Sequence, residues 1–281
     1  TGLLVTLVSG LANVFLDYYF IAVCNMGVAG AAVATGIGYF IAAVFGLYYF
    51  ARHREAPLHF VKPRASMQTL MRAMTNGSSE MVSNLSTSVT TFLFNIIMMR
   101  LIGPDGVAAI SILLYLDFVL IAINLGYSIG VAPLFSYNYG SGDCRKLKKL
   151  FRISLYFCTS VGVVMTAGTV LFADWLASVF SPAGSAVHAL AATGLRIFAV
   201  SYLFKGFSIF TSALFTAFGN GTLSAILSFM RTLILLVSAI LLFSSLFGIT
   251  GVWSATPAAE TIAFLLAAFL AWKYGKVYRY L

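Results

Sequence analysis

The chain has 281 residues, of which 60% are hydrophobic and 9% are charged, and its mean hydropathy is +0.96. This composition excludes a soluble globular protein, which needs far more polar surface, and it predicts an all-α polytopic membrane protein. The formal net charge of +9 does not predict a nucleic-acid partner, because Lys and Arg lie in short connections beside apolar segments. Cys24, Cys144 and Cys158 lack the spacing of a zinc site or of a disulfide framework.

Eight apolar segments are long enough to cross a bilayer as helices. Most links between them are short and carry the Gly, Pro, Asn or Asp residues that end helices, which predicts antiparallel hairpins. The exception is a longer basic link, 52–72. The predicted spans are 2–24, 28–51, 73–99, 107–136, 150–174, 187–217, 222–246 and 250–272.

The distribution of basic residues predicts the direction of these spans. Thirteen of the 17 Lys and Arg residues fall in 52–72, in 145–152 or after 272, and alternating spans bring these three segments to one side. We expect that side to be cytoplasmic and the C-terminus to lie there. The three tryptophans lie near predicted span ends and are expected at the membrane interface; they are Trp175, Trp253 and Trp272.

Two similar segments indicate an internal repeat. GVAGAAVAT begins at Gly27 and GITGVWSAT at Gly248, each between two apolar spans and each running in the same direction. The pattern predicts two parallel lobes related by a pseudo-two-fold axis along the membrane normal. We therefore expect 1–51 to hold the last two helices of an N-terminal lobe, 52–72 to be a cytoplasmic linker and 73–281 to be a six-helix C-terminal lobe. Four helices would precede Thr1.

Several longer motifs occur along the chain: NVFLDYYFI, GVAGAAVAT, NGSSEMVSNLSTS, RLIGPDGVAA, GVAPLFSYNYGSG and GVWSATPAAE. They resemble motifs of the multidrug and toxic compound extrusion transporters, in their DinF-like and MepA-like branch, from the fifth helix of that family to its twelfth. The resemblance implies a two-lobe twelve-helix transporter, truncated here to eight helices, in the bacterial cytoplasmic membrane. It also implies export of organic cations by alternating access, driven by Na⁺ or H⁺, with no enzyme activity and no other cofactor. We expect a monomer whose partners are a small organic substrate and membrane lipid.

The span 73–99 carries polar residues at spacings of 4, 3, 4 and 4, which place them on one helical face. A carboxylate in this face is costly in hydrocarbon, so Glu80 is expected to face the protein interior. A carboxylate that alternately holds and releases H⁺ or Na⁺ suits an ion-coupled antiporter, although a structural carboxylate near the cytoplasmic boundary would fit as well. We assign Glu80 and Asn84 to ion coupling and Thr87, Thr91 and Asn95 to the substrate cavity. Many relatives carry a glutamate at the position of Asn84.

Two other spans carry charged residues at membrane depth. A buried Lys205 needs an anion, and we hypothesise that it pairs with Glu80; helix-end carbonyls or water are alternatives. Some relatives carry an aspartate where this chain has Lys205. Asp117 is a second ion-coupling candidate or a hydrogen-bonded structural residue. The hydroxyl and amide residues on the same faces are assigned to the cavity: Asn124, Ser208 and Ser212.

A further set is assigned to gating or structure. Pro133 is expected to break the hydrogen-bond ladder of its helix just before SYNYG, which leaves a pliable helix end. Tyr137, Asn138 and Tyr139 of that motif are expected to cap and fix an inner gate. Glu260, three residues after Pro257, is expected to be a structural partner. Asn13 and Asp17 match the signature of the family's fifth helix. The full set is Asn13, Asp17, Pro133, Tyr137, Asn138, Tyr139, Pro257 and Glu260.

Two other classes of function fit the sequence less well. A lipid or lipid-linked oligosaccharide flippase of the same superfamily would need several basic residues in its cavity, and only Arg196, Lys205 and Arg231 lie deep within the predicted spans. An intramembrane enzyme would need a nucleophile or metal constellation such as HExxH, which the sequence lacks. No metal site is predicted.

Overall fold

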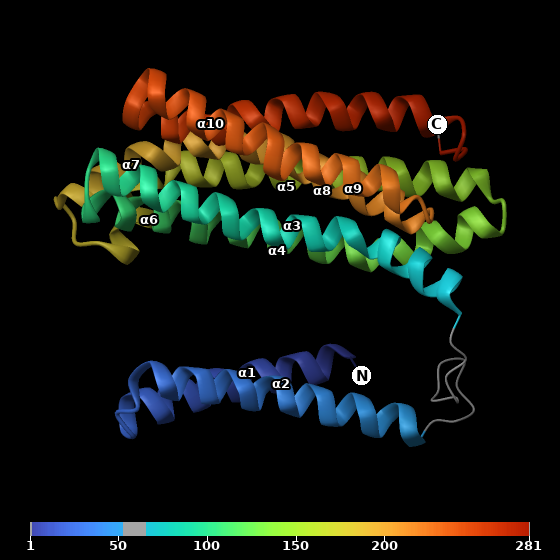
Figure 1. Cartoon of the computed structure of the whole chain (residues 1–281), viewed down its shortest axis with the longest axis horizontal. Coiled ribbons are helices and arrows are strands. Elements are labelled where there is room, and N and C mark those ends of the chain that lie inside the picture. Colours follow the sequence, from blue (N-terminus) through green and yellow to red (C-terminus); the bar gives the residue numbers. More distant parts are fainter. Residues whose placement is uncertain (1, 53–65, 281) are drawn as a thin grey trace. The chain divides into compact units, whose positions relative to one another are not determined.

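The computed structural model describes residues 2–52 and 66–280, apart from the side chains of Arg72, Asn76, Ser79 and Glu80. The chain divides into two units, Thr1–Ser66 and Met67–Leu281 (Figure 1). The boundary falls inside the predicted linker 52–72, most of which lies outside the described residues. Every regular element in the described residues is helical. The all-α membrane architecture predicted from composition is therefore confirmed.

The first unit is a helical hairpin. It consists of α1 (Gly2–Asp17), a π-helical turn η1 (Tyr18–Val23) and α2 (Gly27–Arg52). The Ser9 hydroxyl donates a hydrogen bond of 2.6 Å to the carbonyl of Gly38, which ties the two helices together. Most apolar side chains of the hairpin are exposed, as expected for helices that are solvated by lipid.

The second unit holds the remaining helices, and local sequence signals start several of them. Asp143, Ser185 and Asn220 each accept a hydrogen bond from the backbone N–H three residues ahead, which caps α5, α7 and α9. The elements are α3 (Met67–Leu101), α4 (Pro104–Gly140), α5 (Cys144–Leu171), α6 (Ala173–Phe180), α7 (Ala186–Phe198), η2 (Ala199–Ser201), α8 (Tyr202–Ala217), α9 (Gly221–Phe229), η3 (Met230–Leu235) and α10 (Leu236–Gly275).

Seven helical stretches in the described residues are long and apolar enough to cross a membrane. The last of them, Gly221–Gly275, contains 55 residues and holds both of the last two predicted spans. Gly248 interrupts it with a φ of 56° and a ψ of −128°, and the ribbon of α10 reverses direction there (Figure 1). The two arms of this stretch, on either side of Gly248, correspond to the predicted spans 222–246 and 250–272.

The predicted repeat has a structural counterpart within each unit. Gly27 and Gly248 share a φ of 56°, a left-handed conformation that favours glycine. Gly30 and Gly251, three residues later, both face the preceding helix so closely that a side chain has no room. Each hairpin is therefore closed by the same local geometry, as expected of two homologous lobes.

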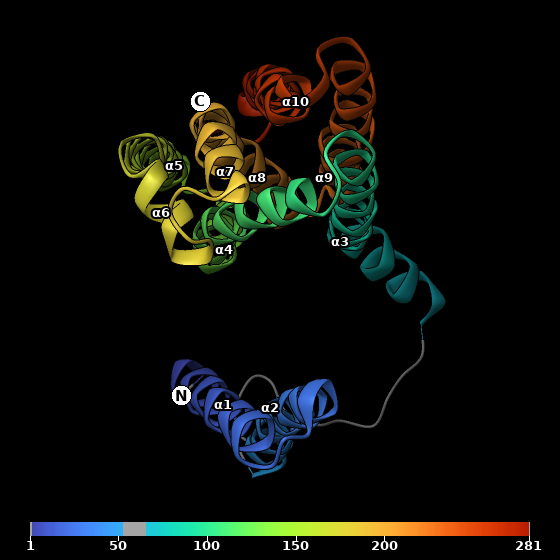
Figure 2. The same ribbon diagram turned by 90° about the vertical axis from the view of Figure 1, so that its left-hand side faces the viewer.

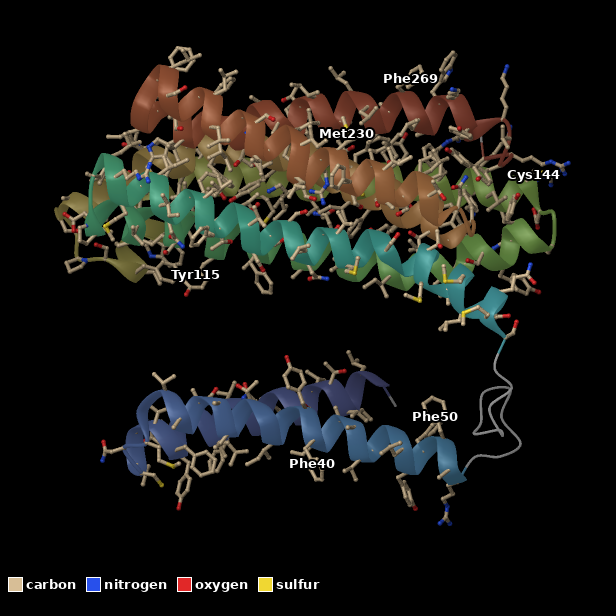
Figure 3. All side chains as sticks on the ribbon, in the orientation of Figure 1. Phe40, Phe50, Tyr115, Cys144, Met230 and Phe269 are labelled. Carbon is tan, nitrogen blue, oxygen red and sulfur yellow. The ribbon has the colours of Figure 1, made fainter. Side chains whose placement is uncertain are left out.

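Helix α8 lies at the centre of the second unit, packed against α4, α5, α9 and α10 (Figure 2). Two glycines permit this close packing. A Cβ at Gly162 of α5 would lie 2.8 Å from the Tyr202 carbonyl, and one at Gly206 of α8 would lie 2.6 Å from Asn124 Oδ1. Small residues at helix contacts are the usual device for close approach in membranes. Many large apolar side chains of the second unit point outward and are exposed (Figure 3).

Three local features differ in detail from the expectations. Helix α4 continues through Pro133 to Gly140, so the proline, which has no N–H to donate to the helical ladder, does not end the helix. The span predicted to end at residue 174 ends at Leu171, and a short helix, α6, follows it. Trp253 is only 1% exposed, since its ring packs against Gly194 of α7, whereas Trp175 and Trp272 are exposed as expected.

Candidate functional site

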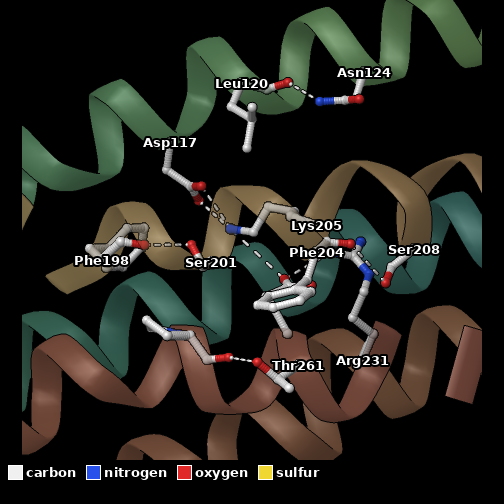
Figure 4. Close-up of polar contacts among 12 residues, drawn as sticks. Asp117, Leu120, Asn124, Phe198, Ser201, Phe204, Lys205, Ser208, Arg231 and Thr261 are labelled. Carbon is white, nitrogen blue, oxygen red and sulfur yellow. Dashed lines mark hydrogen bonds and ion pairs between the residues drawn. The ribbon is translucent and has the colours of Figure 1, made fainter. Parts of the chain in front are cut away.

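Four ionisable side chains meet inside the second unit (Figure 4). They come from four segments that are far apart in the sequence: Asp117 from α4, Lys205 from α8, Arg231 from η3 and Glu260 from α10. Their side chains are between 4% and 12% exposed. Two acids and two bases balance in charge, which is how a buried set of ions avoids an uncompensated charge. We call these four residues the ion cluster.

Lys205 and Asp117 form the tighter half of the ion cluster. Lys205 Nζ donates to both carboxylate oxygens of Asp117, at 2.7 and 2.9 Å. Lys205 Nζ also lies 5.6 Å from the centre of the Phe198 ring, a favourable position for a cation. Asp117 is therefore the anion that a buried Lys205 was expected to need. Asp117 is itself held by hydrogen bonds from Lys205.

Glu260 and Arg231 form the looser half. One nitrogen of the Arg231 guanidinium, Nη1, lies 3.2 Å from Glu260 Oε1, and Lys205 Nζ lies 3.8 Å from the same oxygen. The second oxygen, Glu260 Oε2, and the Arg231 Nε have no hydrogen-bond partner among the described residues, although both are buried. An arginine can bind a carboxylate through two parallel hydrogen bonds, so this pair uses only part of its capacity.

The local backbone helps to explain the placement of Arg231. It lies in the π-helical turn Met230–Leu235, in the middle of an otherwise α-helical span. Such turns widen the helix by one residue and often occur at functional sites. Glu260 follows Pro257 by three residues, so both lie on the same side of α10.

A cavity of about 200 Å³ adjoins the ion cluster, and all four charged residues line it. Its walls come from α3, α4, α8, α10 and the α9–η3 segment. Hydroxyl and amide side chains form most of the rest of its polar lining: Ser83, Asn84, Thr87, Thr90, Thr91, Ser212, Ser228, Thr232 and Thr256. Thr256 Oγ1 is buried and has no partner among the described residues.

The structure brings together several residues that the sequence assigned to the site. Six of the residues assigned to ion coupling or to the substrate cavity line the cavity: Asn84, Thr87, Thr91, Asp117, Lys205 and Ser212. Ser212 is also bonded to Ser224 and Ser228, at 2.9 and 2.8 Å, which joins α8 to α9. The side chain of Glu80 lies outside the described residues, so its pairing with Lys205 and its coupling role stay predictions.

Three residues assigned to the cavity do not line it: Asn95, Asn124 and Ser208. Asn124 is buried between α4 and α8, where its amide nitrogen donates to the Leu120 carbonyl. Ser208 donates to the Phe204 carbonyl at 3.4 Å. Asn124 and Ser208 share a helical face with cavity residues, but both are completely buried away from the cavity.

Of the residues assigned to gating or structure, Glu260 belongs to the ion cluster, while Tyr137, Asn138 and Tyr139 have other surroundings. Tyr139 packs its ring against Phe218 and Tyr278, with centroids 5.0 and 5.6 Å away, while Tyr137 is exposed. Asn138 is buried and donates to the Leu134 carbonyl. In the first unit, Asn13 Nδ2 and Asp17 Oδ1 are buried without a partner among the described residues.

Arg231 is the cluster residue that the sequence assignment missed, and Glu260 was assigned only a structural role. The signal for Arg231 was present, because an arginine inside an apolar span must face protein. The spacing of a single helix could not reveal its partner, since Arg231 and Glu260 lie in different segments of the bent 221–275 stretch.

An all-helical membrane unit with a charge-balanced cluster beside a polar cavity is typical of a membrane transporter. The chain belongs to the MatE family, whose model matches residues 81–241. The recognition from sequence motifs is thereby confirmed.

Relatives and solved structures agree with this family. The chain is 25% identical over 274 residues to the multidrug export protein MepA of Staphylococcus saprophyticus, and 27% identical over 265 residues to MepA of Staphylococcus haemolyticus. These matches cover 95% and 92% of this chain but 58% and 57% of the relatives, so the chain spans little more than half of their length. The fold matches an outward-facing multidrug resistance MATE family transporter with a TM-score of 0.89 and 24% identity, over 99% of this chain and 63% of the other.

Proposed function

We propose that the protein carrying this chain is a cation-coupled antiporter that exports organic, cationic compounds by alternating access. The observation that carries the proposal is the ion cluster, which lies beside a polar cavity in a membrane-spanning unit. Charged side chains at membrane depth are costly, and they are retained where they line a path for ions or substrates. The relatives named as multidrug export proteins support the same reading.

The residue roles follow from position. Asp117 and Lys205, together with Asn84 and Glu80, are proposed for coupling to Na⁺ or H⁺. Thr87 and Thr91 are proposed to contact the cargo. The location we propose is the bacterial cytoplasmic membrane. The basic segments 145–152 and 273–279 lie at the same end of the second unit, where Figure 1 marks the C-terminus, and we propose that this end is cytoplasmic.

A flippase for a pyrophosphate-linked lipid is the less favoured function. Its anionic cargo would need unpaired basic residues in the cavity. Among the described lining residues, Lys205 and Arg231 are the basic ones, and each contacts a carboxylate. The net charge of this part of the cavity is therefore not positive.

Dye efflux from membrane vesicles tests the antiport. The full-length protein that contains these 281 residues would be reconstituted into vesicles loaded with a fluorescent organic cation. A pH gradient or a Na⁺ gradient would then be imposed. We expect one gradient to accelerate efflux and an ionophore that collapses it to abolish the effect. An efflux rate that depends on neither gradient would refute the antiport proposal.

The proposed pairing of Glu80 with Lys205 is tested by the same assay. The variants Glu80→Gln and Lys205→Ala and the double variant would be compared. Coupled effects on efflux support the pairing, while strictly additive effects would end it.

A further inference from the structure

The two halves of the ion cluster differ in how fully their hydrogen bonds are made. Lys205 satisfies both oxygens of Asp117, at 2.7 and 2.9 Å. Arg231 reaches Glu260 through one nitrogen at 3.2 Å, and one oxygen of Glu260 has no partner among the described residues. Separating Lys205 from Asp117 would break two short charge-assisted hydrogen bonds, whereas separating Arg231 from Glu260 would break one longer hydrogen bond.

We propose that Glu260 is the group that binds the positive charge of the cargo, and that Arg231 is a tethered cation that occupies Glu260 while the cavity is empty. This assignment rests on the proposed function and deepens it. The exchange at Glu260 leaves the two short bonds between Lys205 and Asp117 in place, so this pair keeps the ion-coupling role proposed above. The cargo class is an organic cation that displaces the Arg231 guanidinium from Glu260.

The surroundings of Glu260 fit this exchange. Among the residues that the structure describes, Lys205 of α8 and Arg231 of η3 are the positive groups that face it, and Asp117 of α4 pairs with Lys205. Thr256, one turn before Glu260 on α10, lines the same cavity with a buried hydroxyl that has no partner among the described residues. Glu260 Oε2 and Thr256 Oγ1 thus supply acceptors that the resident arginine does not use.

The segment that carries Arg231 offers a route for its release. A π-helical turn holds one residue more than an α-helical turn, so conversion of η3 to α-helix turns the residues before or after it by about 100°. Such a turn changes the direction in which the Arg231 side chain points and so separates the guanidinium from Glu260. The exchange therefore needs no movement of the Asp117–Lys205 pair.

Direct binding of tetraphenylphosphonium, an organic cation, tests the assignment without relying on transport. Equilibrium dialysis would compare purified natural-length proteins: wild type, Arg231→Gln, Glu260→Gln and the double variant. Removing the competing charge from Arg231 should lower the Kd about tenfold or more, because two like charges a few ångströms apart in a protein repel by over 1 kcal/mol. Glu260→Gln and the double variant should bind at least about tenfold more weakly than wild type.

Two further variants separate charge from packing. Arg231→Lys keeps the positive charge and should bind within about twofold of wild type by the same charge argument. Arg196→Gln is the matched control, since Arg196 pairs with Asp174 at an exposed site away from the cavity. It should leave the Kd unchanged.

The outcomes distinguish this assignment from the proposed function. If Arg231→Gln fails to tighten binding, or if the double variant binds as wild type does, the assignment is overturned. The double variant leaves no unpaired charge from this pair, so it remains informative even if a single variant does not accumulate. Energised efflux of the same cation with an unchanged Kd in Arg231→Gln refutes the assignment alone. No binding and no efflux by the wild type refutes the export of organic cations as well.

Discussion

The side chain of Asn124 in α4 occupies the space in which residue 206 of α8 would carry a Cβ atom. An ideal Cβ at Gly206 would lie 2.6 Å from Asn124 Oδ1, far inside van der Waals contact. The amide of Asn124 is held in place by its hydrogen bond to the Leu120 carbonyl, at 3.1 Å. The contact sets how closely α4 approaches α8, and therefore how Asp117 meets Lys205.

Gly206→Ala should destabilise the second unit by about 1–3 kcal/mol, as overpacking of a close contact does. The double variant Gly206→Ala with Asn124→Ala should recover most of the loss, because it removes the obstructing amide. Thermal unfolding of the detergent-solubilised protein, followed by tryptophan fluorescence, measures the effect. Gly126→Ala on α4, where no atom lies within 4 Å of the added Cβ, is the control and should not lower the unfolding temperature. Equal losses in the single and double variants would refute the steric cause.

The second prediction concerns the Asp117–Lys205 pair. Lys205→Ala leaves the Asp117 carboxylate buried without its main partner and should cost about 3–5 kcal/mol of stability. Replacing both residues by apolar ones, Lys205→Met with Asp117→Leu, should restore much of this loss, since no unpaired charge remains.

The unfolding temperature and the amount of protein in the membrane are the measurements for this pair. The exposed pair of Arg196 and Asp174, whose side chains are 50% and 65% exposed, is the comparison. Arg196→Ala should cost less than about 1 kcal/mol, because solvent screens such pairs. A loss for Lys205→Ala no greater than that for Arg196→Ala would contradict the structural role given to the buried pair.

The third prediction concerns the final hairpin. The carbonyl of Phe243 lies where a Cβ at Gly251 would be placed, so Gly251→Ala must force the two arms of α10 apart. We expect a loss of stability of about 2 kcal/mol or more, by the mechanism of overpacking. Gly248→Ala should cost about 1–2 kcal/mol through its left-handed φ of 56°.

Gly130→Ala serves as the control for the hairpin variants, because it lies within α4 and has open space around its Cβ position. Protease accessibility of the hairpin and the unfolding temperature would both be measured. Wild-type behaviour of Gly251→Ala would show that the two arms can separate without cost.

The fourth prediction concerns the start of α5. Hydrogen bonds from the side chain and the backbone N–H of Lys146 to Asp143 hold the pKa of that carboxyl below its ordinary value of 3.8. A depressed pKa in the folded state means that the contribution to stability is complete above pH 3.8 and is lost as the pH falls through the lower folded-state value. Between pH 5 and pH 8 the cap should therefore be insensitive to pH, on the rule that a titrating group acts only near its pKa values.

Hydrogen exchange of the backbone amides of residues 144–147 would report on this cap. Asp143→Ala should accelerate exchange at every pH in that range, while Asp143→Asn should retain much of the protection because asparagine also caps helices. A protection that falls steadily from pH 8 to pH 5 would point to a different group.

The sequence by itself determined the approximate limits of the apolar helices and the likeness of the two hairpins. Hydrophobic length alone predicts a span, because lipid leaves an extended apolar segment no alternative to a helix with its backbone bonds made internally. The repeat was readable because Gly27 and Gly248 need the same left-handed φ, which few other residues adopt. The sequence also required Lys205, Arg231 and Glu260 to face protein, since a charge in hydrocarbon is costly.

Only the tertiary structure decided which charges meet. The spacing within one helix predicts a shared face, but not the depth or the identity of the helix that covers that face. Asn84, Thr87 and Thr91 line the cavity, whereas Asn124 and Ser208 are covered by helix contacts. The choice of Asp117 for Lys205 and of Glu260 for Arg231 depends on the packing of α4, α8, η3 and α10 around one point, because a buried charge is stabilised by whichever opposite charge the packing brings within hydrogen-bond distance.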